Sequence, residues 1–275
     1  MNEIVRLALE EDIGSGDVTT ESCVPADRQA RGRFLARESL VVAGLELLTQ
    51  FYEPLWDGAS APPYIAVHKH NGDACNDGDV IAEVNGPARL LLTRERVALN
   101  FLQRLSGVAT LARQFADAVA GTNCKVLDTR KTTPGLRDLE KAAAAAGGVT
   151  NHRKGLYDAI LIKNNHIAAA GGVRTAIGQA RAASKLEIEI EVRTRAELRE
   201  ALDCGATHLL LDNLTPGDAA DWIREIDGRA KVELSGGITL ATVRAYAETG
   251  ADYVSSGAIT HSARAMDISF RLELL

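Results

Sequence analysis

Cationic side chains gather in one stretch of this chain, between Lys125 and His166. The stretch contains eight lysines and arginines against four acids, a local balance of +4, although the whole chain of 275 residues has a formal net charge of −6. Clustered cations repel one another unless a counter-charge lies among them, so the stretch is suited to a small, strongly anionic ligand. A nucleic-acid surface needs a wider basic footprint, which this acidic composition does not offer.

The cations of this stretch follow short apolar runs that read as buried strands. Arg130 and Lys131 come soon after Val126-Leu127, and Lys163 directly follows the run 159–162. His152 and Arg153 lie between them. Side chains at strand ends are held rigidly, as a catalytic site requires. The plainer alternative is a solvated basic loop, which does not explain why cations recur at separate strand ends.

Acidic residues occupy matching positions later in the chain. Glu189 and Glu191 alternate with apolar residues, so both carboxylates point to the same face of a strand. Asp212 follows the next apolar run, His208 to Leu211. Buried carboxylates need partners, and a cation or a Mg²⁺-bound ligand would supply one for Glu189 and Glu191. Glu189 is alternatively a structural partner for a lysine.

Two small turns follow the last two predicted strands: Ser235-Gly236-Gly237 and Ser256-Gly257. Each is expected to open a helix and to present backbone N–H groups to a phosphate. Glycine allows the close approach that such a contact needs.

From Lys125 onward, predicted strands alternate with predicted helices, which indicates a parallel α/β sheet closed or nearly closed into a barrel. Six strands are clear and a seventh is expected before Asn151, so an incomplete, open barrel is favoured over eight strands. In such a barrel the chemistry lies at the carboxyl ends of the strands. The predicted strands are 126–127, 159–162, 188–192, 208–211, 232–234 and 253–254, and the helices are 136–146, 173–183, 195–203, 216–226 and 240–248.

Residues 1–107 are expected to form an α+β, sandwich-like domain, and residues 108–275 the barrel domain. The first part predicts an amphipathic helix near residues 4–9, a helix over 44–52 and a β-rich region over 61–92, with Leu90 to Leu92 as its last strand. Thr93 is expected to cap the helix that follows. The C-terminal tail is expected to pack back onto the N-terminal domain.

The composition also bears on location. No apolar run approaches the roughly 20 residues that span a bilayer, and the N-terminus lacks the features of a signal peptide. Four scattered cysteines (Cys23, Cys75, Cys124 and Cys204) indicate neither a zinc site nor a disulfide framework. A cytoplasmic protein is expected.

Long ordered phrases resemble the quinolinate phosphoribosyltransferase family: DTRKTTPGLRDLEK, GGVTNHRKGLYDAILIKNNHI, TRERVALNFLQRLSGVAT and the C-terminal VELSGGITLATVRAYAETGADYVSSGAITHSARAMDISFRLEL. The resemblance implies a type II phosphoribosyltransferase fold. It also implies transfer of phosphoribosyl from 5-phosphoribosyl-1-pyrophosphate (PRPP) to quinolinate, with loss of CO₂ and formation of nicotinate mononucleotide in NAD biosynthesis.

The resemblance further assigns roles. It implies a homodimer in which Arg96 reaches the partner's site, and Mg²⁺ held by Glu191 and Asp212, through water. The quinolinate set is Arg96, Arg130, His152, Arg153 and Lys163; the catalytic set is Lys131, Lys163, Glu191 and Asp212; the phosphate set is Lys131, Glu191, Asp212, Ser235, Gly236, Gly237, Ser256 and Gly257. Asn164 and Ser256 depart from the family pattern, which common members fill with an acid and a valine.

Three alternatives remain open from the residues. A paralogue of the same fold, linked to molybdate transport, would act on another heteroaromatic acid. A Schiff-base lyase or aldolase would use Lys163 as nucleophile, which leaves the other cations unexplained. A lipoyl-type carrier module would need a lysine at a hairpin tip, and Lys69 lies ahead of the turn.

Overall fold

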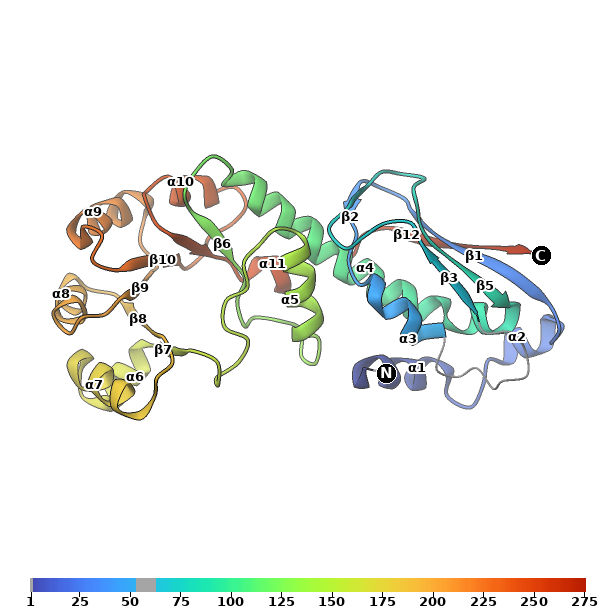
Figure 1. Ribbon diagram of the computed structural model, residues 1–275, viewed down its shortest axis with the longest axis horizontal. Coiled ribbons are helices and arrows are strands. Elements are labelled where there is room, and N and C mark those ends of the chain that lie inside the picture. Colours follow the sequence, from blue (N-terminus) through green and yellow to red (C-terminus); the bar gives the residue numbers. More distant parts are fainter. Residues whose placement is uncertain (1, 53–62) are drawn as a thin grey trace. The chain divides into compact units, whose positions relative to one another are not determined.

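The computed structural model describes residues 2–52 and 63–275, which divide into two compact units (Figure 1). The first unit comprises the described residues up to Leu111 together with Thr133–Gly148 and Ala263–Leu275. The second comprises Ala112–Thr132 and Val149–Ser262. The chain therefore returns to the first unit twice, and the basic stretch is divided between the two. The boundary at residues 107 and 108 stays a prediction.

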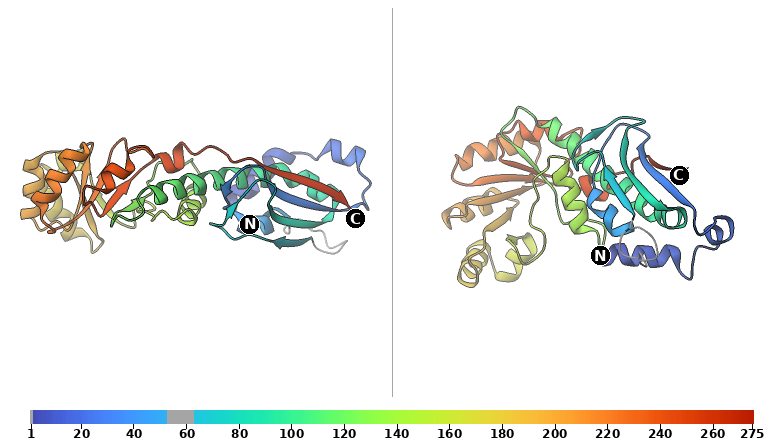
Figure 2. Two further views of the ribbon diagram at one scale, coloured as in Figure 1. Left: turned by 90° about the horizontal axis from the view of Figure 1, so that it is seen from above. Right: turned by 45° about the vertical axis from the view of Figure 1, so that its right-hand side comes forward.

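The second unit is built on a parallel sheet with the strand order β6-β11-β10-β9-β8-β7. The sequences of these strands are near-continuous apolar runs, because helices cover the sheet and bury its side chains. Ile190, Leu209 and Leu211, for example, are fully buried. Figure 2 shows the helices on the outside of these strands. The strands are β6 (Lys125–Leu127), β7 (Ile160–Ile162), β8 (Ile188–Val192), β9 (His208–Asp212), β10 (Lys231–Ser235) and β11 (Tyr253–Ser255), and the helices are α6 (Asn164–Ala170), α7 (Val173–Ala183), α8 (Arg195–Asp203), α9 (Pro216–Ile226), α10 (Val243–Ala247) and α11 (Ala258–His261).

The barrel is open. Among the described strands, β6 and β7 are the two edges of the sheet, and no ladder joins them. The seventh strand expected before Asn151 is reduced to a single parallel bridge between Leu127 and Thr150. It goes no further because the next backbone N–H group, that of His152, donates to the carboxylate of Asp128 at 2.7 Å and not to a strand.

The first unit contains an antiparallel sheet in the order β12-β1-β5-β3. The last strand of the chain, β12, pairs along β1, from Ala36 opposite Ile268 to Ala30 opposite Leu274. The strands of this unit are β1 (Gln29–Ala36), β2 (Leu40–Val41), β3 (Tyr64–Val67), β4 (Ala74–Cys75), β5 (Val80–Pro87) and β12 (Ile268–Leu274); its helices are α1 (Glu3–Ile13), α2 (Val18–Cys23), η1 (Leu45–Leu47), α3 (Leu48–Tyr52) and α5 (Arg137–Ala146). The predicted β-rich region begins at residues 61 and 62, which lie outside the described residues.

One long helix, α4 (Ala88–Ala118), follows β5 directly and supplies residues to both units. Figures 1 and 2 show it running along a face of the four-stranded sheet. The strand expected at Leu90 to Leu92 and the cap expected at Thr93 are therefore wrong. A three-residue apolar run does not distinguish strand from helix. The Thr93 hydroxyl instead donates to the Asp17 carboxylate at 3.0 Å, beside the N-terminus of α2.

These features confirm the predicted fold class, an α+β N-terminal part with an incomplete parallel α/β barrel. In the described part of the chain, no helix is long and apolar enough to cross a membrane.

Candidate active site

A cavity of about 730 Å³ lies in the second unit, at the carboxyl ends of the parallel strands. The ends of parallel strands meet at one edge of a sheet, so residues far apart in sequence converge there. Twelve of the thirteen predicted site residues line this cavity: Arg130, Lys131, His152, Arg153, Lys163, Glu191, Asp212, Ser235, Gly236, Gly237, Ser256 and Gly257. The thirteenth, Arg96, is an exposed residue of α4 in the first unit and does not line it.

The β6 and β7 side of the cavity is strongly cationic. Burial lowers the pKa of Arg153, and the positive charge of Arg130 lowers it further. The two guanidinium groups thus lie close enough to repel each other. Lys131 and Lys163 are exposed on the same cavity wall. Like charges held together by the fold favour an anionic ligand that bridges them.

A buried acid fixes the segment that carries His152 and Arg153. Asp128, which is fully buried at the end of β6, accepts hydrogen bonds from Asn151 Nδ2 and from the backbone N–H of His152, both at 2.7 Å. Lys163 is fixed differently, since its backbone begins α6 and its N–H donates to His166 Nδ1 at 2.9 Å. The cations therefore stand on rigid backbone.

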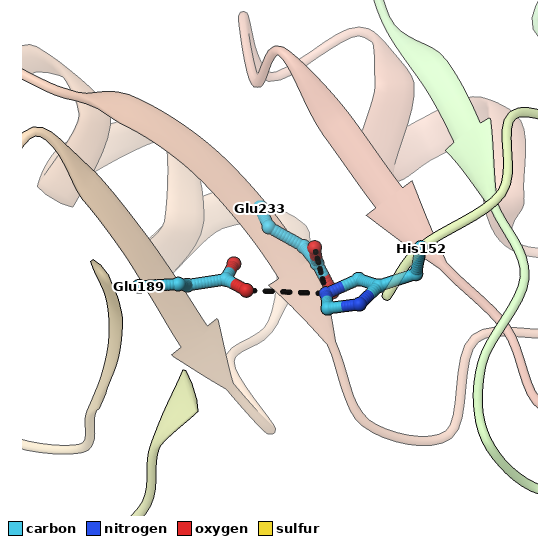
Figure 3. Close-up of side chains that lie close together, drawn as sticks. All are labelled: His152, Glu189 and Glu233. Carbon is cyan, nitrogen blue, oxygen red and sulfur yellow. Dashed lines mark hydrogen bonds and ion pairs between the residues drawn. The ribbon is translucent and has the colours of Figure 1, made fainter. Parts of the chain in front are cut away.

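His152 forms a cluster with two carboxylates (Figure 3). Its Nε2 atom lies 3.1 Å from Glu189 Oε2, on β8, and 3.3 Å from Glu233 Oε2, on β10. Burial by itself lowers the pKa of His152, but the hydrogen bonds and charges of the two carboxylates outweigh it and raise the pKa to about 10. Glu189, proposed from the sequence as a partner for a lysine, therefore has a histidine as its partner.

The other ring nitrogen of His152 is also engaged. The backbone N–H of Arg153 donates to Nδ1 at 2.7 Å, so in this geometry the ring proton is on Nε2. A second ring proton, which the two carboxylates favour, would go to Nδ1 and break the contact with Arg153. The cluster also separates the main cavity from a second one of about 360 Å³ at the amino-terminal ends of the strands. His152 thus forms part of the cavity floor.

Two acids stand on the β8 and β9 side of the cavity. Glu191 is buried at the end of β8 and Asp212 is partly buried at the end of β9. Both carboxylates contact one guanidinium nitrogen, Arg193 Nη2, at 2.8 Å from Glu191 Oε1 and 3.2 Å from Asp212 Oδ2. Asn213 Nδ2 donates to the same Asp212 oxygen at 2.7 Å. The cavity therefore has a cationic wall and an acidic wall.

The two glycine turns lie beside these walls, and they differ from expectation in part. Ser256-Gly257 leads directly into α11, but Ser235-Gly236-Gly237 is followed by a turn, and α10 begins only at Val243. Gly236 has φ +101° and a Cβ there would lie 2.2 Å from Asn213 Oδ1. The Ser256 hydroxyl donates to the Ile238 carbonyl at 2.7 Å, so it joins the two turns and is not directed at a ligand.

Several polar residues of the cavity lining were not assigned from the sequence, among them Glu233, Arg193, Asn213 and His261. Glu233 stands two residues before Ser235 on β10, the same alternation that identified Glu189 and Glu191. His261 follows Gly257 by one helical turn, and a Cβ at Gly257 would lie 3.1 Å from its ring. Arg193 follows Glu191 by two residues, which places it on the same face.

Comparison with known proteins identifies the family of the chain. The family model described as "Quinolinate phosphoribosyl transferase, N-terminal domain" matches residues 17–106, and the model described as "Quinolinate phosphoribosyl transferase, C-terminal domain" matches residues 108–271. The chain is 42% identical to the "Probable nicotinate-nucleotide pyrophosphorylase [carboxylating]" of Bacillus subtilis, over 96% of this chain and 90% of that protein.

Two further relatives extend the similarity. The chain is 40% identical to "Quinolinate phosphoribosyltransferase [decarboxylating] 2b, mitochondrial" of Nicotiana tabacum, over 99% of this chain and 82% of that protein. The crystal structure of NadC from Streptococcus pyogenes superposes with a TM-score of 0.91 at 40% identity, over 99% of this chain and 96% of that one. The two family models together cover residues 17–106 and 108–271, and the chain belongs to the quinolinate phosphoribosyl transferase family.

Proposed function

We infer that this chain transfers the phosphoribosyl group of PRPP to the ring nitrogen of quinolinate, a step of NAD biosynthesis. Pyrophosphate and CO₂ leave and nicotinate mononucleotide forms. The observation that carries this assignment in the structure is the division of one cavity into a wall with paired arginines and a wall with two carboxylates and glycine turns. The names of the relatives favour quinolinate over another heteroaromatic acid as the acceptor.

Arg130 and Arg153 are assigned to the two carboxylates of quinolinate. Arginine binds carboxylates in bidentate fashion, and the repulsion between these two guanidinium groups is relieved when a dicarboxylate lies between them. Lys163 and His152 complete the pocket on the same wall. The role of His152 is the less direct one, because both of its ring nitrogens already have partners within the protein.

Lys131 and the turns at Ser235-Gly236-Gly237 and Ser256-Gly257 are assigned to the donor phosphates. Backbone N–H groups of glycine turns bind phosphate oxygens, and a Cβ at Gly257 would lie 2.7 Å from Lys131 Cδ, so the lysine packs on this turn. Ser256 contributes its backbone, since its hydroxyl is bonded to Ile238.

Glu191 and Asp212 are assigned to the sugar and to Mg²⁺. Transfer of a glycosyl group develops positive charge on the sugar ring, which nearby carboxylates stabilise. The two acids also suit Mg²⁺, which prefers oxygen ligands. Glu191 Oε1 is buried, and its contact with Arg193 Nη2 at 2.8 Å is an ion pair without hydrogen-bond geometry. Bound Mg²⁺ would neutralise the leaving pyrophosphate.

The bond changes need no further cofactor. The ring nitrogen forms a bond to the ribose carbon as the bond to pyrophosphate breaks. The nitrogen then carries a positive charge, so the electron pair left at C2 when CO₂ departs is stabilised, and C2 takes up a proton.

The assembly is proposed to be a homodimer in which Arg96 enters the partner's cavity. Arg96 is exposed and does not line the cavity of its own chain, so a role at the site has to be exerted on another copy. A cytoplasmic location is proposed from the four cysteines, all of which are free thiols.

The test of the function is formation of product by the purified protein from quinolinate, PRPP and Mg²⁺. Nicotinate mononucleotide, pyrophosphate and CO₂ should appear in equal amounts. Formation of a quinolinate mononucleotide that keeps both carboxylates would contradict the coupled loss of CO₂.

A further inference from the structure

Arg193 stands between the two acids that the proposed function assigns to the metal. Its Nη2 atom lies 2.8 Å from Glu191 Oε1 and 3.2 Å from Asp212 Oδ2. The sequence of this strand end, Glu191-Val192-Arg193, puts the arginine on the same face as Glu191. One guanidinium nitrogen therefore lies between the two carboxylates that would hold a divalent cation.

The burial of the three side chains is unequal. The side chain of Glu191 is 5% exposed and that of Asp212 is 14% exposed, whereas that of Arg193 is 47% exposed. Two carboxylates that face each other in a partly buried site are costly unless a cation lies between them. Arg193 supplies that cation when no ligand is bound. Because half of its side chain already reaches solvent, it can leave without exposing apolar surface.

The backbone below Arg193 is fixed, so only the side chain can move. Its N–H donates to Glu197 Oε2 at 2.8 Å, within the capping box that begins α8 at Thr194. Asp212 is held separately by Asn213 Nδ2 at 2.7 Å. Departure of the guanidinium would therefore leave the Asp212 carboxylate in position.

We propose that Arg193 is an exchangeable counter-ion that competes with the divalent cation for Glu191 and Asp212. This rests on the proposed function, which gives those two acids to the metal. Arg193 offsets one of the two negative charges of the acidic wall in the empty enzyme and must be displaced when the metal and PRPP enter. The released guanidinium then lies at the edge of the cavity, where a diphosphate can attract it. Arg193 is thus a positioning residue that sets the metal concentration at which the enzyme works.

The experiment is a Mn²⁺ titration followed by the electron paramagnetic resonance signal of the free ion, with PRPP present and quinolinate absent. Without quinolinate there is no turnover, so the readout is binding. The variants are Arg193→Ala and Arg193→Gln, with Arg193→Lys as the change that keeps the charge. Arg195→Ala is the matched control, because Arg195 is a neighbouring exposed arginine whose ion pair is with Glu225, outside the cavity.

Removal of the competitor should tighten Mn²⁺ binding about three- to tenfold in Arg193→Ala and Arg193→Gln, while Arg195→Ala stays like the unaltered protein. Unchanged or weaker Mn²⁺ binding in both Arg193 variants would overturn the inference, and so would an unaltered protein that binds no Mn²⁺. Failure of the proposed reaction would show instead in the product assay, with the titration intact.

Discussion

The mutual repulsion of Arg130 and Arg153 favours the binding of a dianion between them. The fold keeps two guanidinium groups close enough for one charge to lower the pKa of the other, and Asp128 and Asn151 hold the backbone beneath them. A dicarboxylate that bridges the pair removes the repulsion and forms charge-assisted hydrogen bonds. Binding energy then comes from a site that needs no rearrangement.

Replacement of Arg130 by alanine should weaken quinolinate binding by roughly 10- to 100-fold, as expected for loss of a hydrogen-bonded charged partner. PRPP binding should change less than about threefold, since Lys131 and the glycine turns remain. Isothermal titration of each substrate separately measures both. Arg174→Ala, an exposed arginine of α7 outside the cavity, is the control. Unchanged quinolinate affinity in Arg130→Ala would remove this residue from the acceptor pocket.

Replacement of Glu233 by glutamine should lower the pKa of His152 by about one unit or more, because one of the two carboxylates that raise it is lost. A raised pKa in the folded state stabilises the protein below the ordinary value of about 6.5. That stability disappears as the pH rises through about 10. Nitrogen-15 NMR of labelled histidine gives the titration directly, with His152→Gln to identify the signal. An unaltered pKa in Glu233→Gln would mean that the carboxylate does not interact with the ring.

Residue types and strand ends suffice to predict most of the charged residues that line the cavity, because β-strand alternation and the carboxyl-end rule of parallel sheets are local. Residue types and strand ends do not predict which of these side chains contact one another. The pairs His152 with Glu233 and Arg193 with Asp212 join different strands. Which side chains meet across a barrel depends on strand register and on the closure of the sheet. For this reason Glu189 was paired with the wrong residue type.

Among the elements, the βα repeats of the second unit are the best predicted. Helices α7, α8 and α9 begin and end at the predicted residues, since each has an apolar stripe and a clear end signal. The start of α4 was missed because Leu90 to Leu92 form an all-apolar run directly after a strand. The expected seventh strand is only a single bridge at Thr150. It does not continue because the N–H group of His152 donates to the Asp128 carboxylate and not to a neighbouring strand.

Gly107 allows α4 to pass close to the chain before β12. A Cβ there would lie 1.8 Å from the carbonyl oxygen of Arg264, a backbone atom that cannot turn aside. Gly107→Ala should therefore destabilise the protein by about 1–3 kcal/mol. Gly178→Ala is the control, since this glycine of α7 has nothing within 4 Å of its Cβ position and should gain up to about 1 kcal/mol. Urea unfolding compares the two. Equal stability of both variants would show that the Arg264 segment shifts without cost.

For the molecule as a whole, the chain order and the spatial units do not coincide. The first unit takes α5 from the middle of the chain and β12 from its end, and β12 closes the sheet against β1. The return of the C-terminal tail was expected from the sequence, but no sequence pattern indicates that α5 belongs to the first unit. The cavity belongs to the second unit only, which leaves the proposed role of Arg96 to the assembly.

A complementation experiment tests the proposed exchange of Arg96 between subunits. Arg96→Ala and Arg130→Ala should each be almost inactive alone. If the site is shared, mixing and reassociating them gives heterodimers with one complete site. A 1:1 mixture should then regain about a quarter of the unaltered activity. Mixtures no more active than the separate variants, with exchange of subunits verified by mass, would contradict a shared site.

The most direct measurement of the central claim compares quinolinate with nicotinate as acceptor, with PRPP and Mg²⁺ in both reactions. The two acids differ only in the 2-carboxylate, which is the group that the paired arginines are proposed to hold and that leaves as CO₂. We predict nicotinate mononucleotide and CO₂ from quinolinate and no measurable product from nicotinate. Equal turnover of nicotinate would contradict the claim that the cationic wall selects a dicarboxylate.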